Sequence, residues 1–173
     1  MRRRIAILVA LVALLALGGG ALTAPPAWAL TQQSQVVHVD DSFSVSGICS
    51  FPIDVRFGPG DMRVSLFFDA NGTLVKEVDS NFGGPFPTSI SGNGVTLTSV
   101  ATFAHLITFN PDGSVATLRD SGIDFIFTVP GQGAVVVQTG TVVFDKDFNI
   151  LFEGGPHPFN HGDFGALCAA LSG

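Results

Sequence analysis

The sequence predicts an all-β protein, a single antiparallel β-barrel or β-sandwich of about 8–10 strands with a short C-terminal helix. Three observations predict this fold class. Apolar and polar residues alternate with a period of two, turn signals separate the alternating stretches, and a helical period appears only near the C-terminus. A continuous series of hairpins slightly favours the barrel, because a closed barrel has no exposed strand edge.

Residues 1–29 have the organisation of a cleavable signal peptide. Three arginines at positions 2–4 precede an apolar run over 5–17, and Ala27-Trp28-Ala29 forms a small-x-small cleavage site. Glycines and Pro25-Pro26 interrupt the apolar stretch, so it is too short and too broken to cross about 30 Å of hydrocarbon. We therefore expect residues 30–173 to be a secreted β domain without stable membrane insertion.

Composition limits the partners of this domain. Cleavage after Ala29 leaves five basic and fourteen acidic residues, a net charge of −9, which disfavours nucleic acids and other polyanions. The sixteen Phe residues stay, whereas Trp28 is removed and the chain has no Tyr. Because Phe has no polar group to place at a surface, we expect most of these rings to form the core.

The alternation is clearest in three stretches, 51–57, 63–68 and 123–129. Each is predicted to be a strand with one buried and one wet face. The residues expected on the buried faces are Phe51, Ile53, Val55 and Phe57 in the first, Val64, Leu66 and Phe68 in the second, and Ile123, Phe125, Phe127 and Val129 in the third.

Three similar segments, 68–74, 109–115 and 144–150, each place Asp or Asn in a tight turn. They are predicted to be hairpin tips, because Asn and Gly accept positive φ and Asp or Asn side chains bond back to turn amides. Further reversals are expected at 92–94 and 131–133. Gly140 is expected to bend the long strand over 134–144.

The only helical pattern lies at the C-terminus, with Asn160 or Asp163 as the expected cap. Its apolar stripe has the spacing i, i+3, i+4 and i+7 and consists of Phe164, Leu167, Cys168 and Leu171.

The two cysteines, Cys49 and Cys168, are expected to form a disulfide, the default state in an exported protein. This bond would attach the helix to the strand region around Cys49. The alternative is a free reactive thiol, but no nearby basic residue would lower its pKa.

The segment 156–163 contains the most site-like residues. His157, His161 and Asp163 offer two imidazoles and a carboxylate within seven residues, a donor set that suits zinc or a similar metal. The alternative is ordinary loop and capping chemistry, because a metal needs three or four converging ligands. His105 shares strand parity with Phe103 and Ile107, so it is either a buried hydrogen-bonded histidine or a polar group that orients an apolar ligand.

Other motifs are incomplete, and no motif predicts a cofactor. Asp145, Asp147 and Asn149 have the opening spacing of a calcium loop, but Gly at the sixth and Glu at the twelfth position are missing. Asn71-Gly72-Thr73 is interpreted as a turn and not as a glycosylation site. No nucleophile elbow or phosphate-binding loop occurs. A Ser-His-Asp site assembled from separate strands has no sequence motif, because such triads are defined by geometry.

Three segments, together with the signal, resemble a group of secreted actinobacterial proteins of unknown function: Cys49-Ser50-Phe51-Pro52-Ile53-Asp54-Val55, Gly140-Thr141-Val142-Val143-Phe144-Asp145 and Leu167-Cys168-Ala169-Ala170-Leu171. The resemblance implies export and the disulfide, and it assigns no activity.

The sequence leaves three hypotheses about function. The first is a non-enzymatic binding or interaction module of the cell exterior with an unknown extracellular partner, favoured by the exported scaffold without catalytic motifs. The second is a carrier of a small apolar molecule in a barrel interior beside His105. The third is a hydrolase or isomerase with a site near His157 and His161.

Overall fold

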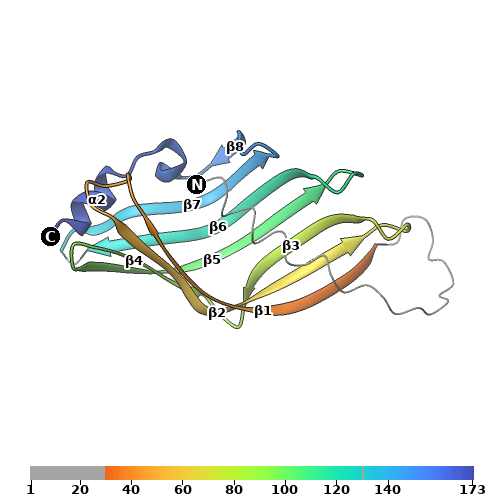
Figure 1. The fold of residues 1–173 in the computed structure, drawn as a ribbon, viewed down its shortest axis with the longest axis horizontal. Coiled ribbons are helices and arrows are strands. Elements are labelled where there is room, and N and C mark those ends of the chain that lie inside the picture. Colours follow the sequence, from red (N-terminus) through yellow and green to blue (C-terminus); the bar gives the residue numbers. More distant parts are fainter. Residues whose placement is uncertain (1–29, 130) are drawn as a thin grey trace.

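The computed structural model describes residues 30–129 and 131–173, so the predicted signal peptide lies outside the described residues. Eight strands are followed by a 3-10 turn and a short helix (Figure 1). In chain order these elements are β1 (Thr31–Val45), β2 (Ile53–Phe68), β3 (Leu74–Phe82), β4 (Phe86–Gly92), β5 (Val95–Phe109), β6 (Val115–Val129), β7 (Gly133–Asp145), β8 (Ile150–Gly154), η1 (Pro158–His161) and α2 (Gly165–Leu171).

All eight strands belong to one antiparallel sheet, which confirms the predicted fold class. The order along the sheet is β1-β2-β3-β5-β6-β7-β8, and β4 pairs with β2 and β5. β3 pairs with one half of β2 and β5, while β4 pairs with the other half of each. The path of paired strands begins at β1 and ends at β8, so we describe a strongly curved sheet with two edges instead of a closed barrel.

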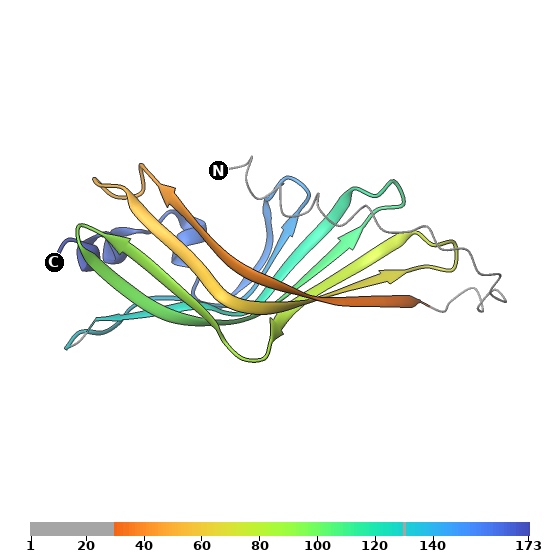
Figure 2. The same ribbon diagram turned by 60° about the horizontal axis from the view of Figure 1, so that its bottom comes forward.

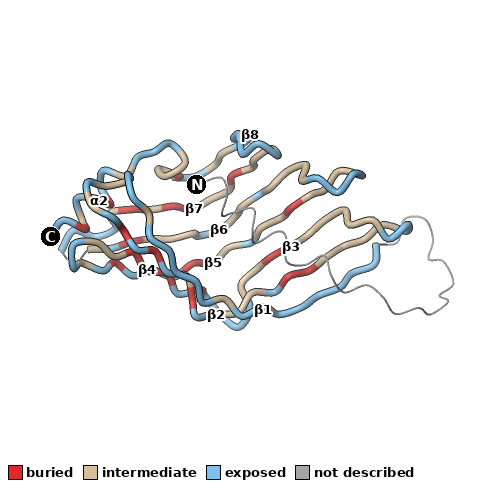
Figure 3. Tube along the Cα trace, in the orientation of Figure 1, coloured by how far each residue is buried: buried red, intermediate tan, exposed pale blue. Residues whose placement is uncertain are grey.

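One end of the curved sheet is closed around a hydrophobic core. Figure 2 shows α2 between the ends of β1, β2 and β4 on one side and those of β6 and β7 on the other. Its Leu167 and Leu171 are buried, as the helical spacing predicted, and most of the fully buried residues lie at this end (Figure 3). The core there consists of Ile53, Val55, Ile90, Leu97, Phe127, Val136, Leu167 and Leu171.

The structure confirms that Cys49 pairs with Cys168, with their Cα atoms 5.5 Å apart. The bond joins α2 to the loop between β1 and β2, across a sequence separation of 119 residues. It therefore attaches the last element of the chain to the first hairpin and keeps α2 in the closed end of the sheet.

Glycines allow neighbouring strands to approach closely where the sheet bends. Gly122 and Gly140 face each other on β6 and β7, and both have positive φ, +128° and +124°. A Cβ would lie 2.2 Å from the Thr102 carbonyl oxygen at Gly122 and 2.0 Å from that of Gly154 at Gly140. No side chain fits at these distances, so both positions require glycine. Because the two glycines lie side by side on paired strands, the bend predicted at Gly140 continues across neighbouring strands.

The predicted buried face of 123–129 is wrong at its first residue. A β-bulge between Ile123 and Phe125 shifts the register with β7, so Ile123 is exposed while Phe127 is fully buried. The extra residue is Asp124, which is partly buried. A bulge re-aims side chains in this way because two residues oppose one on the partner strand.

The predicted cap of the C-terminal helix is also wrong. Phe164 occupies the N-cap position, without a side-chain cap bond. Asp163 lies next to the cap and its carboxylate accepts a hydrogen bond from the Gly165 amide at 3.4 Å. The 3-10 turn that contains Asn160 lies between β8 and α2, which moves Asn160 away from the start of α2.

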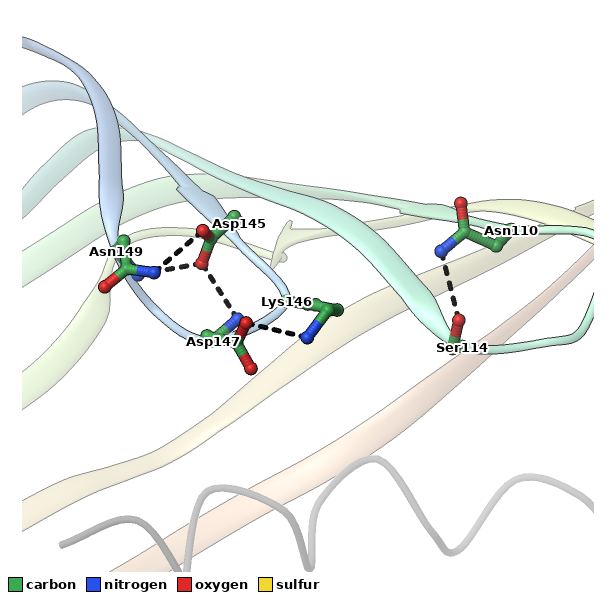
Figure 4. A network of polar contacts seen from close by, with 6 residues as sticks. All are labelled: Asn110, Ser114, Asp145, Lys146, Asp147 and Asn149. Carbon is green, nitrogen blue, oxygen red and sulfur yellow. Dashed lines mark hydrogen bonds and ion pairs between the residues drawn. The ribbon is translucent and has the colours of Figure 1, made fainter.

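The three predicted hairpin tips share one geometry. In each, the fourth residue of the turn has positive φ: Gly72, Gly113 and Phe148, with φ of 80°, 82° and 61°. Figure 4 shows that the Asp145 carboxylate accepts hydrogen bonds from the amide of Asp147 and from Asn149. The calcium-like spacing at this tip is therefore explained by turn hydrogen bonds.

No helix among the described residues is long and apolar enough to cross a membrane.

We expect Gly122→Ala to destabilise the domain by more than about 3 kcal/mol, because a methyl group would overlap the Thr102 carbonyl as well as adopt a disfavoured φ. Gly113→Ala is the matched control. Gly113 also has positive φ but nothing lies within 4 Å of its Cβ position, so its cost should stay near ~1 kcal/mol. Urea unfolding followed by circular dichroism measures both; equal costs would refute the close-approach argument.

Candidate functional site

Ionisable side chains form a row across three neighbouring strands in the open half of the sheet. Asp79 on β3 pairs with His105 on β5, and His105 pairs with Asp120 on β6. Directly paired residues point to the same face of a sheet, with Cβ atoms about 4.5–5.5 Å apart. β5 has no register shift between Leu97 and His105, so this face also carries the core and α2. We call it the concave face.

Two further residues reach this row from outside the regular strand pattern. Asp124 comes from the bulge in β6, and its carboxyl lies close enough to Asp120 for the charge of Asp120 to raise its pKa. His157 comes from the loop after β8, where the Pro156 carbonyl accepts a hydrogen bond from the Thr139 amide. Glu77 lies two residues before Asp79 on β3 and therefore shares its face. We call these residues the ionisable cluster: Glu77, Asp79, His105, Asp120, Asp124 and His157.

His105 connects the row to an aromatic neighbour. Its Nε2 lies 3.4 Å from Asp120 Oδ1, and its ring stacks on Phe103 with a centroid separation of 4.6 Å. Burial lowers the pKa of His105, while the charge of Asp124 acts in the opposite direction. Its side chain keeps 33% of its surface exposed, so solvent reaches this imidazole from the concave face.

Burial raises the pKa of all four carboxyl groups in the cluster. The pKa of Asp79 rises to about 7 through burial and the neighbouring charge of Glu77, whose own pKa is also raised by burial. The pKa of Asp124 rises to about 6 through burial and the charge of Asp120, while His105 and His157 oppose the rise. Burial also raises the pKa of Asp120. The carboxyls of this site therefore hold protons nearer neutral pH than ordinary carboxyls do.

Several buried polar atoms of the cluster have no hydrogen-bond partner among residues 30–129 and 131–173. They are Oδ1 of Asp79, both ring nitrogens of His157, and Oδ1 of Asp120, which lies 3.4 Å from His105 Nε2 but forms no hydrogen bond with it. Asp79 is 7% exposed and His157 is 5% exposed, so protein atoms cover most of both side chains. A buried polar group without a partner costs about 1–3 kcal/mol, which makes such a concentration unusual in one place.

Apolar side chains surround the cluster on the concave face. An apolar row lies next to the row of Asp79, His105 and Asp120. It begins at Glu77 on β3 and continues in register through Ile107, Leu118 and Phe144. Two surface hollows, of about 360 and 370 Å³, lie between β5 and β6 and between β1 and β2, and no cluster residue lines either. The cluster is thus part of a curved wall rather than one of these hollows.

The predicted metal ligands are not brought together. His157 is buried beside Asp120 and Asp124, whereas His161 is exposed and its Nε2 lies 2.7 Å from Glu153 Oε2. Asp163 instead contacts the start of α2. Within residues 30–129 and 131–173, no group of three His, Cys, Asp or Glu side chains is arranged to hold a metal ion.

Sequence analysis identified His105 and His157 but missed the four carboxyls. Parity within β5 placed His105 on the apolar face, and the same argument applied to β3 would have put Glu77 and Asp79 on one face. No signal in the sequence shows that this face is the concave one. Asp124 depends on the bulge, which the regular alternation of 123–129 concealed.

The arrangement supports two kinds of chemistry. Neighbouring carboxyls with raised pKa beside imidazoles can transfer protons near neutral pH. Unpartnered polar atoms within an apolar wall can equally orient a bound molecule by hydrogen bonds. Both require access from solvent, which exists at His105 and Asp120, whose side chains are 33% and 22% exposed.

Comparison with known proteins gives no relative to assist this choice. No protein-family model, no curated protein and no solved structure matches the chain.

We expect the free energy of unfolding to fall as the pH rises from about 4 toward about 7 and to level off above that, with the part from about pH 6.5 to pH 7 free of the opposing effect of His105. Folded Asp79 retains a proton up to about pH 7, whereas an unfolded Asp loses it near pH 4, so this stabilisation is complete at low pH and lost as pH rises. His105 acts in the opposite sense only below about pH 6.5. The fall should not exceed about 1.4 kcal/mol per pH unit for each carboxyl.

Asp79→Asn should flatten this dependence, because an amide does not titrate. Asp61→Asn is the control, since Asp61 is an accessible carboxylate that pairs with His38 elsewhere on the sheet. Urea midpoints at several pH values measure the effect. A wild-type stability that rises between about pH 6.5 and pH 7 would contradict the assignment.

Proposed function

We propose that the protein is an exported, non-enzymatic binding protein that holds a small, largely apolar molecule against the concave face of its sheet. One observation carries the proposal: buried polar atoms without partners lie within a wall of apolar side chains. Ligand sites have this composition, with a few polar groups that orient a mainly apolar guest.

The division of the sheet supports this function. The closed end contains a hydrophobic core cluster and α2, and no residue of the ionisable cluster belongs to that core. The ligand would contact His105 and Asp120, which solvent reaches, and would pack on Phe103, Ile107 and neighbouring apolar residues. His105 then has the role of polar handle.

Export is supported by the organisation of residues 1–29 and by the disulfide. The sequence of that segment is typical of a signal peptide. Disulfides persist in oxidising compartments and are rare in the cytosol. The Cys49–Cys168 pair therefore fits a protein of the cell exterior.

We expect a small molecule to co-purify with the protein secreted by its native host, because a ligand would partner the buried polar atoms. Native mass spectrometry of the gently purified protein would show an added mass that denaturation releases. Asp120→Ala should reduce its occupancy at least about tenfold through loss of a polar contact.

Asp61→Ala serves as the control in this measurement, because Asp61 is not part of the cluster and its side chain is 47% exposed. Occupancy that is equal in wild type and Asp120→Ala would place the ligand elsewhere. Protein that carries no added mass and binds nothing in a screen of apolar compounds would refute the proposal.

Acid–base catalysis is a second candidate, and the paired carboxyls favour it. The carboxyls of Asp120 and Asp124 interact, and burial together with the charge of Asp120 raises the pKa of Asp124 to about 6. Such a pair resembles the general acids and bases of hydrolases and isomerases. The site would lie at His157 and not at His161. Chemical conversion of the co-purified compound by wild type, but not by Asp124→Asn, would favour the enzyme.

A further inference from the structure

The charges on the concave face are unbalanced. Four carboxyls, Glu77, Asp79, Asp120 and Asp124, lie there with two imidazoles. Other strands contribute Val64 from β2 and Val142 from β7 in register with Asp79 and Asp120. Glu153 on β8 is in register with Val142, and its carboxylate contacts His161.

No lysine or arginine of the described residues pairs with these carboxyls. Each of the five basic side chains contacts another group. Three contact polar groups: Arg56 bonds Asp40, Arg119 bonds Ser121 and Lys146 bonds Asp147. The other two lie over aromatic rings, Arg63 over Phe82 and Lys76 over Phe67. The described residues therefore provide no lysine or arginine for the carboxyls of the cluster.

The unpartnered atoms have a definite preference. When ionised, the Oδ1 atoms of Asp79 and Asp120 only accept hydrogen bonds, while the two unpartnered nitrogens of His157 include at least one N–H donor. An anionic ligand would be repelled by the carboxylates, and a neutral one would leave their charge uncompensated in a buried place. A ligand that carries positive charge and several N–H donors satisfies both requirements.

We propose that the site binds an organic monocation, a protonated amine on an apolar body, with its ammonium group among Asp79, Asp120 and Asp124. This inference rests on the proposed binding function and names its ligand class. The ammonium group supplies up to three donors, and the apolar body contacts Phe103, Ile107 and Leu118.

Binding is then coupled to proton release. Near neutral pH, Asp79 and Asp124 hold protons for part of the time. The incoming ammonium group favours their ionised forms, so each carboxyl that was protonated gives its proton to the solvent. Affinity for the amine should therefore rise between about pH 5 and pH 8, while the amine itself stays protonated up to about pH 10.

The test is calorimetric titration of the secreted protein, freed of any co-purified compound, with three probes of equal chain length: n-octylamine, n-octanol and octanoate. At about pH 8 octylamine should bind at least about tenfold more tightly than octanol, with no binding of octanoate. Its affinity should fall at least about tenfold at about pH 5. Heat in buffers of different ionisation enthalpy should report released protons.

Asp79→Asn and Asp124→Asn should each weaken octylamine binding at least about tenfold without weakening octanol, whereas Asp61→Asn should change neither. Both substitutions preserve side-chain volume, and thermal melts confirm folding. If one variant does not fold, the other carries the comparison.

Equal affinity for octylamine and octanol would overturn the amine inference and leave the binding function in place. A co-purified compound without a basic nitrogen would also overturn the amine inference. Binding of calcium or zinc chloride, without binding of octylamine, would overturn it as well. Absence of binding by every probe, together with no co-purified compound, would overturn both the inference and the proposed function.

Discussion

The close approach of backbone to backbone at the bend of the sheet is the constraint on which the other features depend. At Gly58, Gly122, Gly140 and Gly155 a Cβ would lie 2.0–2.3 Å from a carbonyl oxygen of a neighbouring segment. All four have positive φ, which L residues with side chains rarely adopt. Only glycine lets the backbone approach so closely at these positions. The sheet can therefore turn sharply there, and one half curls around α2 while the other half remains open.

The two halves have opposite energetic roles. The closed end buries aliphatic and aromatic side chains against Leu167 and Leu171 and is held by the disulfide. The open half buries carboxyls and an imidazole without partners, which opposes folding. Raised pKa values reduce that penalty, since a protonated carboxyl is cheaper to bury than its anion. The closed end must therefore stabilise the chain enough to tolerate the cluster.

Local patterns predicted the fold well, and they failed where geometry depends on distant pairing. Alternation located the extended residues around Ile53 and Val64, although the two strands predicted there are one strand, β2, in the structure. Helical spacing placed Leu167 and Leu171 in the core. The bulge at Asp124 was missed because its flanking residues keep an apparently regular alternation. The row of Asp79, His105 and Asp120 needs the register of three strands, and sequence separation within one chain does not determine that register. For the same reason, proximity in sequence misleadingly grouped His157 with His161.

Packing alone does not explain why this row is ionisable. Val64 and Val142 occupy the same row on β2 and β7, directly beside Asp79 and Asp120, and both are buried. Apolar side chains are thus accommodated at adjacent positions of the same face. Replacing buried ionic groups with apolar residues of similar volume is often neutral or stabilising. The cluster is costly for the folded state and no lysine or arginine of the described residues offsets it, so its chemistry is better explained by something that the protein binds than by the stability of the sheet.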